Sequence, residues 1–80
     1  MIDVTTKKPL RVTPDESAGP YIRLSLAQVD AIRRLFDSHG VRYWVSENAI
    51  SLNNGPYMTI VNLGRGGDAD AVQTLLDTVG

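Results

Sequence analysis

Apolar and polar positions along the chain switch between two periods after residue 20. A period of two predicts strands at 21–24, 41–45 and 49–52, followed by a longer strand over 57–63 that is apolar on both faces. A period of three to four predicts helices that begin after Ser25 and after Asp70. The predicted order is therefore β-α-β-β-β-α, in which the strand at 49–52 is short enough to be absent.

Each predicted helix begins with a capping-box pattern. Ser25 is followed three residues later by Gln28, and Asp70 is followed three residues later by Gln73. In this pattern the first side chain accepts from a main-chain N–H of the first turn, and the glutamine returns to the N–H of the capping residue. The first helix is expected to end at Gly40, a residue that readily adopts the left-handed conformation after a helix.

The predicted fold class is α+β. Both helices are apolar on one side only, so both are expected to cover the same face of the sheet. The result is a two-layer sandwich with a mixed, mostly antiparallel sheet of three to four strands and two helices on one face. This arrangement resembles a ferredoxin-like domain that lacks its last strand. The resemblance concerns the fold alone and implies no function.

Residues 1–19 differ from the rest of the chain. Prolines interrupt a mostly polar stretch in which no apolar pattern persists. We expect a flexible N-terminal arm at 1–19 and a single domain at 20–80. Two short alternations, Ile2/Val4 and Leu10/Val12, leave open the alternative that the arm adds an edge strand and shields the sheet.

The amino-acid composition excludes several classes of protein for this chain. Eighty residues with 42% hydrophobic and 21% charged side chains are typical of one small globular domain. A net charge of −1 lacks the basic surplus that supplies non-specific affinity for nucleic acid. The chain has no cysteine, hence no disulfide or thiolate site. Without an apolar span or secretory signal, we expect a cytoplasmic protein that does not bind membranes.

The side chains offer little for catalysis. His39 is the one histidine, and its place at the end of the first predicted helix is explained by interaction with free helix carbonyls. The carboxylates do not cluster at spacings typical of a metal loop or of a paired acid and base. We therefore predict no enzyme, no catalytic residue, no metal and no cofactor.

One loop has a physical mechanism for binding an anion. Gly64, Arg65, Gly66 and Gly67 join the longest strand to the last helix, where free N–H groups and the positive end of the helix dipole converge. The alternative is an ordinary glycine-rich connection, because Asp68 and Asp70 would compete for the same N–H groups. The loop therefore carries the hypothesis of a small anion- or nucleotide-binding regulatory module.

The uncovered sheet face carries the other candidate site. If Ile22 and Leu24 point at the helices, alternation sends neighbouring residues to the opposite face. The residues predicted there are Tyr21, Arg23, Arg42 and Trp44. Aromatic and arginine side chains are enriched in interface hot spots. The alternatives are that the arm folds back over this face or that Trp44 packs at a rim.

These patterns rank three functions. The first is a small non-enzymatic interaction domain, a homodimer or a subunit of a complex, that uses the open face and binds protein. The second is the anion-binding module. The third is binding of single-stranded nucleic acid by stacking of bases on the exposed aromatics, which the acidic balance disfavours.

Overall fold

In the computed structural model, which describes residues 1–46, 50–51, 55 and 57–79, strand β4 (Tyr57–Asn62) organises a small antiparallel sheet. Strand β1 (Tyr21–Ser25) pairs with one edge of β4. Strand β2 (Trp44–Val45) and the short strand β3 (Ile50–Ser51) pair with its other edge. Every described pairing between these strands is antiparallel, so the mixed sheet expected from the sequence is not found among them.

Hydrogen bonds alternate in direction along β4. The Leu63 N–H donates to the Pro20 carbonyl on the β1 side at 2.9 Å, and the Ile60 carbonyl accepts from Ser46 N–H on the β2 side at 2.8 Å. Odd-numbered positions therefore bond toward β1 and even-numbered positions toward β2. Side chains alternate as well. Val61, an odd-numbered position, is fully buried.

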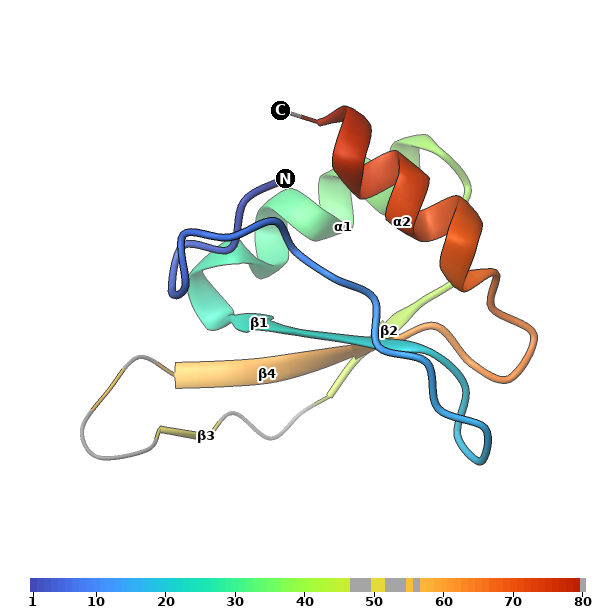
Figure 1. Cartoon of the computed structure of the whole chain (residues 1–80), viewed down its shortest axis with the longest axis horizontal. Coiled ribbons are helices and arrows are strands. Elements are labelled where there is room, and N and C mark those ends of the chain that lie inside the picture. Colours follow the sequence, from blue (N-terminus) through green and yellow to red (C-terminus); the bar gives the residue numbers. More distant parts are fainter. Residues whose placement is uncertain (47–49, 52–54, 56, 80) are drawn as a thin grey trace.

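Two helices cover one face of the sheet (Figure 1). A short 3₁₀ turn, η1 (Leu26–Gln28), leads into helix α1 (Val29–Ser38), and helix α2 (Ala69–Thr78) ends the fold. The core lies between the two layers. Its buried members are Leu10, Ile22, Leu24, Ile32, Phe36, Val61, Leu63, Val72 and Leu76. The fold is thus α+β with two helices on one side, while the ferredoxin-like detail stays a prediction.

Most predicted elements are present with shifted ends. Only 44–45 of the predicted strand 41–45 pairs with β4. The reason is the Val41 N–H, which donates to the Phe36 carbonyl at 2.9 Å and keeps the start of this segment at the end of α1. The turns predicted at 46–48 and 53–56, and part of the strand at 49–52, fall largely outside the described residues.

The N-terminal segment contributes to the core. Leu10 is 2% exposed and belongs to the main apolar cluster, against which Met1 and Val12 also pack. Thr13 exchanges two main-chain hydrogen bonds with Tyr21, at 2.7 and 2.9 Å, so the arm touches the outer edge of β1 at one point. The sequence pattern did not single out Leu10 as a core residue. The flexibility of residues 1–19 stays a prediction about motion, but their packing favours the alternative of an attached segment.

Two glutamine side chains hold this segment to the helices. The Gln28 amide accepts from Val4 N–H at 3.0 Å and donates to the Ile2 carbonyl at 2.7 Å. The Gln73 amide accepts from Val12 N–H at 2.8 Å and donates to the carbonyl of residue 10 at 3.0 Å. Each glutamine therefore satisfies a donor and an acceptor two residues apart, as a neighbouring strand would.

The glutamine roles predicted from the capping boxes are wrong. Ser25 does cap η1, with its Oγ accepting from Ala27 N–H at 3.2 Å, but Gln28 turns to the arm instead of back to the cap. The cap of α2 is Asp68, whose Oδ1 accepts from Ala71 N–H at 3.0 Å. Asp70, the predicted cap, lies in the first helical turn, so the pattern with Gln73 does not form.

Substitution of Leu10 by alanine is expected to lower the free energy of unfolding by about 2–5 kcal/mol, because it leaves a cavity in the core. Urea denaturation measures this loss. Ile2→Ala is the matched control, since Ile2 lies in the same segment and is 44% exposed; its effect should stay within about 0.5 kcal/mol. Equal effects of the two substitutions would show that the segment does not contribute to the core.

Substitution of Gln73 by alanine is expected to cost about 1–3 kcal/mol, since it removes the partners of two part-buried main-chain groups. Amide exchange should report the loss locally, as faster exchange at Val12 and little change at Val61. Thr74→Ala, one position further along the same helix and exposed, is the control. Unchanged exchange at Val12 in the Gln73 variant would contradict the proposed anchor.

Candidate functional site

The side of the sheet without helices carries side chains from β1, β4 and β2, and residues in register on these strands form rows across it. Tyr21, Asn62 and Trp44 are in register on β1, β4 and β2 and so share a face. Arg23 stands opposite Ile60 in the next row of the same face. We use "open sheet face" for Tyr21, Arg23, Trp44, Met58, Ile60 and Asn62. The structure thus brings together three of the four residues predicted for this site.

Trp44 dominates this surface. Its side chain is 56% exposed, and it is the first residue of the two-residue strand β2. One edge of the indole lies against Gly64, where an added Cβ would come within 3.3 Å of the Trp44 ring. Gly64 also has a φ of +78°, a conformation that other residues rarely adopt. The glycine therefore leaves room for the indole, a role that the sequence pattern did not indicate.

The N-terminal segment does not cover the open sheet face. Figure 1 shows residues 1–12 on the side of the sheet occupied by the helices, before the chain crosses the edge of β1. The alternative that the arm folds back over Trp44 is therefore not what the structure shows. Arg42, the fourth predicted residue, is exposed just before β2 and belongs to a different surface.

That surface is a groove between α1 and the outer edge of β2. It has a volume of about 690 Å³ and is lined by Arg33 and Asp37 of α1 and by residues 41–45. The Tyr43 hydroxyl donates to Asp37 Oδ1 at 2.9 Å, and its ring meets Phe36 edge-on at a centroid distance of 5.5 Å. Burial, and then the Asp37 carboxylate, raise the pKa of the Tyr43 phenol. We call this surface the edge groove.

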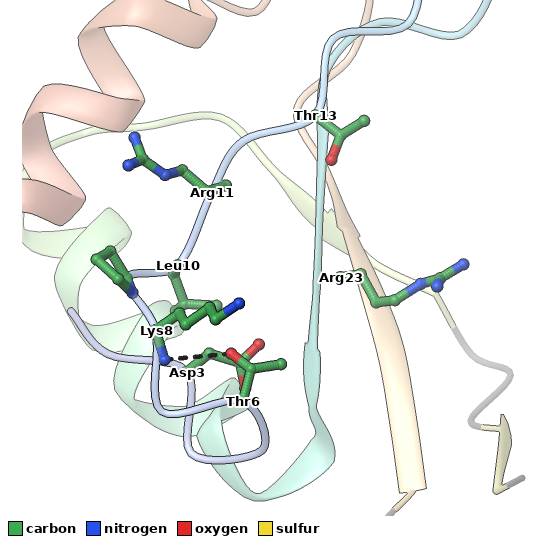
Figure 2. A pocket seen from close by; sticks show the side chains of 8 residues that line it. Asp3, Thr6, Lys8, Leu10, Arg11, Thr13 and Arg23 are labelled. Carbon is green, nitrogen blue, oxygen red and sulfur yellow. Dashed lines mark hydrogen bonds between the residues drawn. The ribbon is translucent and has the colours of Figure 1, made fainter.

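A second hollow, of about 400 Å³, lies between the arm and β1. Three cationic side chains line it: Lys8, Arg11 and Arg23. Figure 2 shows that Arg11 and Arg23 extend to opposite sides of β1, so their guanidinium groups do not converge on one point. An anion in this hollow would not meet all three charges at once.

The groups of the loop predicted to bind an anion form hydrogen bonds within the chain. Gly67 N–H donates to the Gly64 carbonyl at 2.9 Å, and the Asp68 carboxylate occupies the start of α2. Arg65 turns away from the helix, and its Nε donates to the Ser17 carbonyl at 2.9 Å. Gly66 is exposed beside them. Anion binding at Gly64 to Gly67 stays a prediction, and the observed bonds give the loop a structural role.

This loop packs against a second turn at residues 15–19. An added Cβ at Gly19 would come within 2.2 Å of the Gly64 carbonyl oxygen, so the two main chains touch. The turn is held by Asp15, whose Oδ1 accepts from Ser17 Oγ and N–H, each at 2.8 Å, and from Ala18 N–H at 3.1 Å. These hydrogen bonds, that from the Ser17 hydroxyl above all, lower the pKa of Asp15 below its ordinary 3.8.

No catalytic constellation is visible in the described part of the chain. His39 is the C-cap residue of α1, and its main-chain N–H is directed to the carbonyls of residues 36 and 37, at the helix end where the sequence placed it. No group of three or more potential metal ligands occurs among the described residues. In the same residues, no helix has the length and apolar character needed to cross a bilayer.

Comparison of the chain with protein-family models, with curated proteins and with solved structures finds no match. The candidate function therefore depends on the geometry described above.

The Asp15 turn is expected to loosen in acid. A carboxyl group whose pKa is lowered by folding contributes stability above its unfolded value of 3.8, and this contribution is lost as pH falls through the folded pKa. Nuclear magnetic resonance should show the Asp15 carboxyl titrating below 3.8, with the Ser17 and Ala18 amide signals following the same curve. In Asp15→Asn that curve should vanish from both amides. Its persistence would assign the transition to another group.

Proposed function

We propose that this chain is a small non-enzymatic interaction domain that binds a second copy of itself through the open sheet face. The observation that carries the proposal is the row of Tyr21, Asn62 and Trp44 on the side of the sheet without helices, where the indole is 56% exposed. Large aromatic side chains such as tryptophan and tyrosine are enriched among interface hot spots. Half-buried Ile60 and Met58 extend the apolar area around them.

The dimensions of this face support a second copy as the occupant. The whole molecule extends over 34 × 30 × 19 Å, and the sheet forms one broad side of it (Figure 1). A standard interface covers about 800 Å² of each partner, which is on the same scale. A chain of 80 residues also buries a smaller share of its surface than a larger domain does. Covering this face would extend a thin core by a third layer.

The composition of the face suits an isologous contact. In a two-fold dimer the same patch meets itself, so each residue must tolerate its symmetry mate. Tyr21, Asn62 and Trp44 are uncharged, whereas Arg23 lies one row away and is exposed. Arg23 stands on the outer strand β1, so it can stay at the solvated rim while Ile60 of the central strand β4 occupies the middle of the face.

Association is expected to move Trp44 out of water. Because Trp44 is the only tryptophan of the chain, its emission maximum should shift to shorter wavelength as protein concentration rises. Light scattering should show the dimer over the same range. Tyr21→Ala retains the fluorescent reporter and should weaken dimerisation about tenfold or more, the scale of a moderate hot spot.

Tyr57→Ala is the matched control for this experiment. Tyr57 is 60% exposed at the end of β4, but its odd-numbered position directs it away from the open sheet face. It should leave the dimer unchanged. A chain that remains monomeric up to about 1 mM, with constant emission, would overturn self-association. A dimer equally sensitive to both substitutions would place the interface elsewhere.

A further inference from the structure

The outer edge of β2 presents main-chain groups to the edge groove. Ser46 N–H bonds to Ile60 across the sheet, so Trp44 and Ser46 face β4 and the residue between them, Val45, directs its N–H and C=O away from β4. Among the described residues, no strand pairs with this edge. The opposite edge of the sheet differs, because Thr13 of the arm bonds there to Tyr21.

Helix α1 forms the second wall of the groove. Arg33 in the middle of α1 and Asp37 in its last turn line this wall. The floor is formed by residues that are half-buried and pack against the core, namely Val41, Tyr43 and Val45. A free strand edge beside a helix, with an apolar floor, is the geometry in which an extended peptide adds as a further strand. Alternate side chains of such a peptide would point to the floor and away from it.

The charged side chains of the edge groove favour a ligand with negative charge. Arg33 and Arg42 supply two guanidinium groups, against the single carboxylate of Asp37. That carboxylate already accepts the Tyr43 hydroxyl at 2.9 Å. Both arginines are exposed, and neither forms an ion pair with any carboxylate of the described residues. The groove therefore carries more positive than negative charge, with Arg33 close enough to the Tyr43 hydroxyl to oppose the rise of the Tyr43 pKa, whereas the chain as a whole carries a net charge of −1.

We propose that the edge groove binds an extended acidic peptide, which pairs with the main chain of Val45 and places carboxylates against Arg33 and Arg42. Apolar side chains at alternate positions of the peptide contact Val41 and Val45. Because β2 contributes only one outward-facing residue, side-chain contacts and charge provide much of the affinity. Binding is consequently weak and depends on salt. This site is separate from the open sheet face and does not require the chain to dimerise.

The test is a titration of isotope-labelled protein with two capped six-residue peptides, one of alternating Glu and Val and one of alternating Lys and Val. The Glu-Val peptide should bind with a Kd below about 1 mM. It should shift the amide signals of residues 41–45 and slow exchange of the Val45 amide. The Lys-Val peptide should bind at least tenfold more weakly, because its charges repel both arginines.

A charge-reversed variant makes the test specific. Arg33→Glu with Arg42→Glu should exchange the preference, so that the Lys-Val peptide binds and the Glu-Val peptide does not. Lys8→Glu with Arg11→Glu changes the net charge equally at exposed sites on the arm and should leave the preference unchanged. Circular dichroism establishes that both variants are folded.

Three results would overturn the proposal. The first is no binding of the Glu-Val peptide, and the second is equal binding of both peptides. The third is protection of the Val45 amide that rises with protein concentration without peptide, which would make a second copy the occupant of this edge. Failure of dimerisation through the open sheet face shows instead in Trp44 emission without peptide, so the two proposals fail separately.

Discussion

The alternation along β4 is the constraint on which the rest of the structure depends. Successive residues of an antiparallel strand differ both in the direction of their hydrogen bonds and in the face of their side chains. Odd-numbered positions of β4 bond to β1 and bury Thr59 and Val61 under the helices, while even-numbered positions bond to β2 and point to the open side. A shift of one residue would exchange core and surface and would break both sets of pairings. One strand therefore sets the core, the exposed face and the free edge together.

Local patterns in the sequence predicted the elements that local forces determine. Both helices follow from one-sided apolar stripes, and β4 follows from its unbroken apolar run. The same alternation predicted a common face for Tyr21, Arg23 and Trp44, and the strand registers place them on one. These predictions succeeded because periodicity within one element is a property of neighbouring residues.

The missed features depend on residues far apart in the chain. Gln28 and Gln73 matched a local capping pattern, yet their amides bond to main-chain groups 24 to 63 positions away. Leu10 and Val12 form an apolar alternation too short to distinguish an attached segment from a flexible arm, and the burial of Leu10 depends on its contact with the rest of the core. Asp68 replaced Asp70 as the cap because the chain enters the helix two residues earlier than the apolar stripe suggests. Pairwise contacts of this kind leave no periodic trace in the sequence.

Because glutamine amides attach the N-terminal segment, this attachment depends little on salt or pH. A glutamine side chain carries no charge and does not titrate in the range of proteins, so its hydrogen bonds are neither screened by salt nor lost on protonation. Gln28 and Gln73 therefore act as electroneutral tethers. Asp15 can lose its role as acceptor in the turn at 15–19 on protonation, whereas the bonds from the two amides to the main chain of residues 2–12 join uncharged groups. The chain thus combines two kinds of attachment in one short segment, one that responds to its ionic surroundings and one that does not.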